Sequence, residues 1–378
     1  MAKVLVTDGG YPHSLGIIRS LAKLGHHVDC IGNGYCLSRF SRYLNKCIYK
    51  QSNFKSNNIG GFIEFLRRNN YDYLIPVGAE SVRYISNNRK LISQYVIINL
   101  ASNESIEKCL SKIDLLNYAI SLEIPVPRIY TNDYLDDFIS KNNYIPSKLV
   151  IKSKSEIYKN KKVKYISNIN QYIKNYSYSK NNLIQEYIEG YGIGFFAVYY
   201  HGKLKNYFMH KRIRENPPSG GSSVCATSIF DKQAFDYGTN LLNKLNWHGV
   251  AMVEFKKNQN NRQLYLMEVN PKFWGSYDLS MQSGINFAKE YIDISGNIEF
   301  KEVIADKNSI PYKTNIRFQW LAQDIKANLF KPFLLIKAIY EFIYLRTPNN
   351  LWIKDPLATI YLLLLSVFTP LLKSNFFK

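Results

Sequence analysis

The sequence predicts an α/β protein that opens with a mostly parallel sheet and continues as an α+β region. Three observations predict this class. Short β-branched runs alternate with helix-like stretches over about the first hundred residues, further strands follow in the middle of the chain, and the last forty residues are apolar and aromatic. Alternating strands and helices are typical of a parallel sheet with crossover helices.

The first thirty residues predict a strand, a glycine turn, a helix and a second strand, which is a βαβ unit. The turn, Asp8-Gly9-Gly10, breaks a β-branched run, and Gly25 ends the helix. The glycines do not follow the G-x-G-x-x-G spacing, so a nicotinamide dinucleotide is not favoured. The strands are expected at Lys3–Thr7 and Val28–Ile31, and the helix at Ser14–Leu24.

Further elements follow the same reasoning from apolar runs and their breakers. The helices are expected at Gly61–Asn69 and, as one amphipathic helix closed by Ile124-Pro125-Val126-Pro127, at Ile106–Ser121. The strands are expected at Tyr73–Val77, at a run ending near Asn99, and at Lys148–Ser153, Leu183–Ile188, Phe195–Tyr200, Val250–Lys256 and Leu264–Val269.

Composition bounds the function. Among 378 residues, 46% are hydrophobic, which excludes global disorder, and 49 basic against 29 acidic residues give a net charge of +20. The lysines are spread along the chain, so a specific nucleic-acid surface is not favoured. The five cysteines form no C-x-x-C pair and are odd in number, and no signal segment precedes the first strand. A cytoplasmic protein is expected.

Two of the expected strands carry oxygen-bearing side chains. Residues on a strand alternate between faces, so Glu268 and Asn270 share one face, and pairing of the strands would bring Glu254 to the same face. Two carboxylates and an amide oxygen suit a hard cation such as Mg²⁺. A buried carboxylate without such a partner would be costly. The alternative is a pair of edge-strand glutamates in water.

These strands resemble the ATP-grasp superfamily, in particular its carboxylate–amine ligase-like members, the group similar to the carbamoyl-phosphate synthase large chain. The resemblance is carried by Trp247–Phe255 and by Met267–Ser276, which reads Met-Glu-Val-Asn-Pro-Lys-Phe-Trp-Gly-Ser. It implies an ATP-grasp fold with the nucleotide between two α+β lobes. The implied units are an N-terminal open parallel α/β domain (1–105), a small lobe (106–185), a larger lobe (186–300) and a C-terminal extension with an apolar helix (301–378).

The resemblance also implies site residues, although each segment alone fits an ordinary strand or turn. Lys112 and Lys152 would approach the nucleotide phosphates, and Glu189 would accept hydrogen bonds from the ribose. The adenine edge would meet the backbone of Glu186, Tyr187 and Ile188, and the metal would be held by Glu254, Glu268 and Asn270.

The catalytic cations implied by the resemblance are Arg212, within His210–Arg214, and Lys272. Gly220–Ser223 would let backbone N–H groups approach the transferred phosphate. The family commonly has Arg after Asn-Pro; Lys272 keeps the charge but lacks the bidentate fork. Residues 153–164 contain no glycine where many relatives have a mobile loop, and offer the charges of Lys159, Lys161, Lys162 and Lys164 instead.

The implied function is an ATP- and Mg²⁺-dependent ligase, with Mn²⁺ as an alternative metal. A carboxylate would be activated as an acylphosphate for attack by an amine or another nucleophile, forming a C–N bond and releasing ADP. Its partners would be these small molecules. The alternative is a nucleotide-binding ATP-grasp module without catalysis, which Lys272 and the glycine-free stretch motivate.

The C-terminal run Leu357–Thr369 carries no charge. Its thirteen residues are too few for a helix to cross a bilayer, which takes about 20. Two alternatives stay open. The helix packs on the body of the protein, or it lies at a membrane surface with Lys373 and Lys378 beside anionic lipid.

Overall fold

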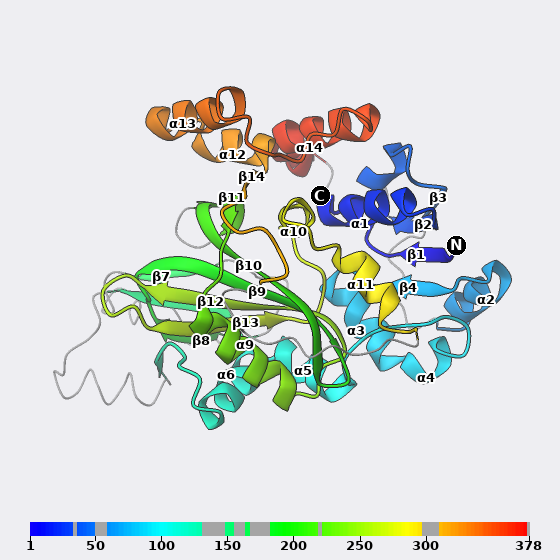
Figure 1. Ribbon diagram of the computed structural model, residues 1–378, viewed down its shortest axis with the longest axis horizontal. Coiled ribbons are helices and arrows are strands. Elements are labelled where there is room, and N and C mark those ends of the chain that lie inside the picture. The colour runs from blue at the N-terminus through cyan, green and yellow to red at the C-terminus, as the bar shows by residue number, and fades with distance from the viewer. Residues whose placement is uncertain are drawn as a thin grey trace.

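The computed structural model describes residues 1–32, 36–49, 59–130, 148–154, 163–166, 182–217, 221–296 and 310–375. Three sheets organise these residues: a parallel N-terminal sheet, a small antiparallel sheet and a large antiparallel sheet. Figure 1 shows the N-terminal sheet on the right, the large sheet on the left and helices α12 to α14 along the top. The α/β class predicted from the sequence, with a parallel N-terminal sheet, is confirmed.

The N-terminal sheet is parallel throughout, in the order β3-β2-β1-β4. Val4, Leu5 and Val6 of its central strand are fully buried, because helices cover both faces of such a sheet. The expected strand ending near Asn99 is instead an isolated parallel bridge from Ile97 to Tyr73. The elements are β1 (Lys3–Val6), α1 (Pro12–Lys23), β2 (His27–Gly32), η1 (Leu37–Phe40), β3 (Lys46–Tyr49), α2 (Ile59–Asn69), β4 (Tyr73–Ile75), α3 (Ala79–Asn87) and α4 (Arg89–Ile92).

The single helix expected over residues 106–121 is wrong. Two helices take its place, because Ser111 has extended backbone angles (φ −91°, ψ 108°) and its Oγ accepts a hydrogen bond from the Asp114 N–H. A serine N-cap of this kind starts a new helix. The small sheet that follows has the order β5-β8-β6-β7. The elements are α5 (Asn103–Leu110), α6 (Lys112–Ser121), β5 (Ile129–Tyr130), β6 (Leu149–Ser153), β7 (Lys164–Ile166) and β8 (Asn182–Glu186).

The large sheet is antiparallel, in the order β13-β12-β9-β10-β11-β14. Its core is aromatic: Phe195, Phe196, Tyr207 and Phe208 are fully buried. Strands β10, β11 and β14 are not among those expected; in β10 most of the apolar residues are grouped at Tyr207–Met209 and do not alternate regularly with polar ones. The elements are β9 (Gly190–Tyr200), β10 (Lys203–Asn216), β11 (Ser222–Ser228), α9 (Lys232–Lys244), β12 (Gly249–Asn258), β13 (Leu264–Asn270), α10 (Tyr277–Gln282), α11 (Phe287–Asp293) and β14 (Arg317–Gln319).

The C-terminal helices connect the two halves of the molecule (Figure 1). They are α12 (Leu321–Asn328), α13 (Pro332–Ile343) and α14 (Pro356–Asn375). Leu362 of α14 packs against Leu15 and Leu37 of the N-terminal domain, and Asp355 forms an ion pair with Arg19 at 2.8 Å. The described part of the chain contains no helix that is both long and apolar enough to span a membrane.

Candidate functional site

A cavity of about 410 Å³ lies between the small and the large sheet. Residues of β6, β7 and β8 line one side, and residues of β10, β12 and β13 line the other. Eight of the lining side chains that the structure describes are charged, four of each sign: Lys112, Lys152, Arg212, Lys256, Glu186, Glu215, Glu254 and Glu268. The cavity is therefore a polar site between two lobes.

Glu254 and Glu268 form the acidic centre of this cavity. Strands β12 and β13 pair in antiparallel register, with Glu254 directly opposite Glu268 and Met252 opposite Asn270. The pairing expected from the sequence, which places three oxygen-bearing side chains on one face, is present. A register shift immediately after Glu254 interrupts the regular ladder beside the two carboxylates.

Each carboxylate has a cationic partner. Arg212 Nη2 lies 2.6 Å from Glu254 Oε2, and Lys112 Nζ lies 3.7 Å from Glu268 Oε2. Burial and the neighbouring Glu268 raise the pKa of Glu254 although Arg212 opposes them. Burial also acts to raise the pKa of Glu268, but Lys112 and the hydrogen bond from Asn270 outweigh it and lower that pKa. The pKa values of the two carboxyl groups are therefore shifted in opposite directions.

Asn270 and Lys272 continue the acidic centre as a hydrogen-bonded chain. Lys272 Nζ donates to Asn270 Oδ1 at 2.9 Å, and Asn270 Nδ2 donates to Glu268 Oε1 at 2.9 Å. Neither residue lines the cavity itself. Lys272 also lies close enough to His13 at the start of α1 that burial and its charge together lower the pKa of His13 to about 3.

The end of β8 and the residues after it form one wall of the cavity. Glu186, Tyr187 and Ile188 line the cavity, whereas Glu189 is exposed and is absent from its lining. The Glu189 carbonyl accepts a hydrogen bond from Gln259 N–H, which anchors the segment to the far end of β12. Lys148 Nζ lies 4.0 Å from the centre of the Tyr187 ring, so this ring is held by a cation–π contact.

Lys152 on β6 lines the cavity together with Lys112 and Glu268. Burial lowers its pKa to about 8, with Glu268 acting in the opposite sense and Lys112 in the same sense. Such a lysine is charged at neutral pH and is poised to lose its proton just above it. Lys112 is tied to the same strand end, since its backbone N–H donates to the Lys154 carbonyl at 2.8 Å.

Three further residues at the site were not predicted from the sequence. Lys256 lines the cavity, and burial lowers its pKa. Glu215 lies 3.5 Å from Arg212. Gln185 is buried, pairs across the sheet with the cavity-lining Val150, and its Nε2 has no hydrogen-bond partner within the described chain. A buried polar group without a partner is rare in native proteins and points to a ligand or water. Sheet register places Gln185 opposite Val150, and the two-residue strand period places Lys256 on the same face as Glu254.

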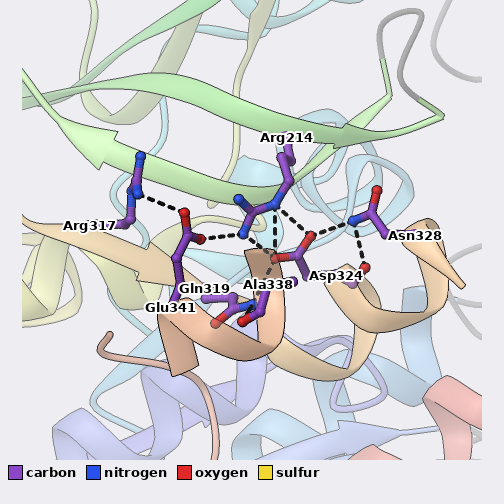
Figure 2. Close-up of polar contacts among 7 residues, drawn as sticks. All are labelled: Arg214, Arg317, Gln319, Asp324, Asn328, Ala338 and Glu341. Atoms are coloured by element: carbon purple, nitrogen blue, oxygen red, sulfur yellow. Dashed lines mark hydrogen bonds and ion pairs between the residues drawn. The ribbon is translucent and has the colours of Figure 1, made fainter. Parts of the chain in front are cut away.

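The basic segment His210–Arg214 divides between two sides of β10. Arg212 lines the cavity and donates to the Gly221 carbonyl at 3.1 Å. The register with β11 shifts between Arg212 and Arg214, and Arg214 turns instead toward α12 and α13 (Figure 2). His210 is buried and hydrogen-bonds Ser276 at 2.8 Å. Lys159, Lys161, Lys162 and Gly220 lie outside the described residues.

The donor set fits a magnesium-bound polyphosphate. Glu254 and Glu268 offer adjacent carboxylate oxygens, which are the ligands that Mg²⁺ prefers. Their present partners are cations, Arg212 and Lys112, so positive charge is required at this position of the cavity. Lys112 and Lys152 stand beside the same carboxylates as point charges for phosphate oxygens.

The family comparison agrees with this geometry. Residues 179–323 match a family model described as ATP-grasp in the biosynthetic pathway with Ter operon. The matched range contains β9 to β13 and therefore Arg212, Glu254 and Glu268. No curated protein sequence is significantly similar to the chain.

Solved structures share the fold at low sequence identity. Biotin carboxylase from Campylobacter jejuni, described as a β,γ-ATP complex, has a TM-score of 0.63 at 13% identity, over 84% of this chain and 74% of that chain. N5-carboxyaminoimidazole synthetase from Staphylococcus aureus has a TM-score of 0.61 at 13% identity, over 87% and 85%. L-amino acid ligase from Bacillus licheniformis has a TM-score of 0.57 at 12% identity, over 77% and 73%.

Proposed function

The chain is an ATP-grasp protein by its fold and by its family-model match, and on that premise we propose that it is an ATP- and Mg²⁺-dependent ligase. It activates a carboxylate as an acylphosphate and passes the acyl group to an amine or another nucleophile, releasing ADP and phosphate. The observation that carries the proposal is the direct opposition of Glu254 and Glu268 inside a cavity that also contains Lys112, Lys152 and Arg212.

Each side chain has a role that follows from its position. Glu254, Glu268 and Asn270 hold the metal, which when bound neutralises charge on the β- and γ-phosphate oxygens. Lys112 and Lys152 orient the phosphates as point charges, and the backbone of Glu186 to Ile188 faces the adenine. Arg212 stands next to Glu254, where it can stabilise the charge that develops on the transferred phosphoryl group.

Lys272 is held in position by the acidic centre. Its contact with Asn270 connects it to Glu268 through two hydrogen bonds, so this cation is positioned relative to the two carboxylates. Catalysis in such a site depends on positioning and electrostatics, and no nucleophilic side chain is required. The Campylobacter structure described as a β,γ-ATP complex, and a Hydrogenobacter thermophilus carboxylase domain described with MgADP, support the choice of nucleotide and metal.

The test is ADP release by the full-length protein with ATP, Mg²⁺ and a panel of carboxylates and amines. Hydroxylamine added to the reaction traps an acylphosphate as a stable hydroxamate, so each carboxylate can be scored without knowing its amine. Hydroxamate formation that depends on Mg²⁺ supports the ligase. Saturable Mg·ATP binding without ADP release or hydroxamate on any carboxylate supports the alternative, a nucleotide-binding module without catalysis.

A further inference from the structure

Helix α13 exposes its large apolar side chains and buries a small and a polar one. Ala338 and Glu341 are its buried residues, whereas Phe333 is 88% and Ile336 65% exposed. A helix on a water-soluble protein normally has the reverse arrangement, with its apolar stripe toward the core. The outward face of α13 therefore lacks an apolar partner within the described chain.

The apolar surface extends beyond this helix. Phe330 before α13, Tyr344 after it and Leu357 at the start of α14 are also mostly exposed. Figure 1 shows α12, α13 and α14 together along one edge of the molecule. Contiguous exposed apolar surface of this kind marks a site of interaction with a protein or a membrane.

The charges of the same helices are sorted by sign. The segment 321–375 contains three acidic residues, and all three are buried: Asp324 and Glu341 pair with Arg214, and Asp355 pairs with Arg19. Figure 2 shows the first two drawn inward toward Arg214. The basic residues whose side chains are described here are all exposed: Lys326, Lys331, Lys337, Arg346 and Lys354. What faces outward is apolar and cationic.

We propose that this C-terminal surface, formed by the exposed residues of 329–364, docks on an anionic membrane surface. Apolar side chains enter the boundary between headgroups and acyl chains, while the flanking cations meet anionic headgroups. Contact with a second copy is disfavoured, because a two-fold interface would place the same cationic surface on both sides. Docking is peripheral, since no described helix is able to span a bilayer.

The test is co-sedimentation of the full-length protein with vesicles. Vesicles of phosphatidylcholine mixed with phosphatidylglycerol are compared with vesicles of phosphatidylcholine alone, at low and at high salt. We expect binding to the mixed vesicles that weakens with salt. Phe333→Asp combined with Ile343→Asp, both at exposed positions, should lower the bound fraction at least tenfold, and Lys337→Glu should lower it only on the mixed vesicles.

Matched controls change equally exposed residues elsewhere. Ile120→Asp on α6 and Lys203→Glu on β10 should leave binding unchanged. The proposal is overturned if the wild-type protein stays in the supernatant at low salt, or if the control variants lose binding as strongly as the C-terminal ones. It is also overturned if analytical ultracentrifugation shows a dimer that Phe333→Asp converts to a monomer while vesicle binding is absent.

A separate cluster lies at the N-terminal sheet, where three cysteines come together. Their spacing in the sequence matches no metal-binding motif. Cys30 on β2 stands opposite Cys47 on β3, and Cys36 approaches both from the turn before η1. The sulfur atoms are 3.3 Å (Cys36 to Cys47) and 3.7 Å (each of these to Cys30) apart. Thiolates bound to a tetrahedral Zn²⁺ at about 2.3 Å lie about 3.8 Å from one another.

Backbone hydrogen bonds order the turn that carries Cys36. The Ser38 N–H donates to the Gly9 carbonyl at 2.9 Å, and the Arg39 N–H donates to the Cys36 carbonyl at 3.2 Å. The backbone at Gly9 lies so close to the cluster that no side chain fits there. A Cβ at this position would lie 2.7 Å from the Cys36 sulfur and 2.8 Å from the Cys30 sulfur. Cys47 is only half-buried, which leaves an approach for an ion. We further infer that these three cysteines form a site for a thiophilic cation of the Zn²⁺ class.

Titration of the reduced full-length protein with Cd²⁺ and Co²⁺ tests this site through the thiolate-to-metal charge-transfer absorption. We expect a saturable band with one ion per chain, and at least about tenfold weaker binding in Cys36→Ala and Cys47→Ala. Cys109→Ala, at another buried cysteine, is the control and should keep the band. An absent band in the wild-type protein, or an equal band in Cys36→Ala, overturns the inference.

Discussion

Arg214 Nη2 lies 2.7 Å from Glu341 Oε2, which ties β10 to α13 across 127 residues of sequence. The same guanidinium contacts Asp324 through Nε and Nη2, and Arg317 reaches Glu341 from β14 at 2.7 Å (Figure 2). The C-terminal helices are therefore anchored to the strand that carries Arg212 at the cavity. This network orients α13 with its polar side inward.

Replacing Asp324 by Ala should destabilise the protein by about 3–5 kcal/mol, because it leaves the buried Arg214 without its main counter-charge. Gln319 and Asn328 would also lose hydrogen bonds to the carboxylate. The measurement is the free energy of unfolding in urea. Asp236→Ala is the control, since its ion pair with Lys232 is exposed and should contribute less than about 0.5 kcal/mol. Equal losses in the two variants would contradict this account.

The sequence predicted the features that depend on local patterns. The βαβ opening follows from apolar runs broken at Asp8-Gly9-Gly10, and the two-residue strand period placed Glu268 and Asn270 on one face. The pairing partner of each strand was not predictable in this way. Gln185 lies opposite the cavity-lining Val150 only through sheet register, and no local pattern separates Glu215 or Lys256 from surface residues.

Residues that only the tertiary structure brings together were also not predictable from the sequence. Arg212 and Arg214 look equivalent in a basic segment, yet a register shift sends one to the cavity and the other to α12 and α13. Cys30, Cys36 and Cys47 show no motif spacing, because they meet through pairing of parallel strands. The break at Ser111 was missed because the apolar pattern continues through it, while its cap on Asp114 depends on backbone geometry.

Glu268→Gln should lower ATP turnover about a hundredfold or more while the fold persists. The substitution keeps the size of the side chain and its ability to form hydrogen bonds. It removes the negative charge opposite Glu254 and beside Lys112. The measurements are ADP release and its dependence on Mg²⁺ concentration, with half-saturation moving to higher Mg²⁺. Glu64→Gln, at an exposed ion pair on α2, is the control. Unchanged turnover with unchanged Mg²⁺ dependence would make Glu268 a structural residue.

Turnover should depend on pH through Lys152, whose pKa burial lowers to about 8. A lowered lysine pKa means that the charge needed for phosphate is present below pH 8 and is lost above it. The quantity to measure is kcat/KM for ATP, because it reports the ionisation of the free enzyme. Above pH 8 we expect it to decrease with pH, with a limiting slope of about tenfold per pH unit. Lys152→Arg keeps its charge over this range, so its profile should be flat between pH 7 and about 9.5. A wild-type profile that is equally flat would exclude this role.

Leu362 distinguishes the two interpretations of the apolar C-terminal helix, which are packing on the body of the protein and location at a membrane surface. It is 3% exposed and packs on Leu15 and Leu37, whereas Leu364 on the same helix is 47% exposed. Leu362→Ala should therefore cost about 2–5 kcal/mol of stability, and Leu364→Ala less than about 0.5 kcal/mol. Urea unfolding of the two variants measures both values. Because of the same packing, deletion of the chain after Asp355 would uncover Leu15 and Leu37 and destabilise the N-terminal domain. If the two leucine variants were equally stable, α14 would not be part of the core, and the whole helix would be available to a membrane.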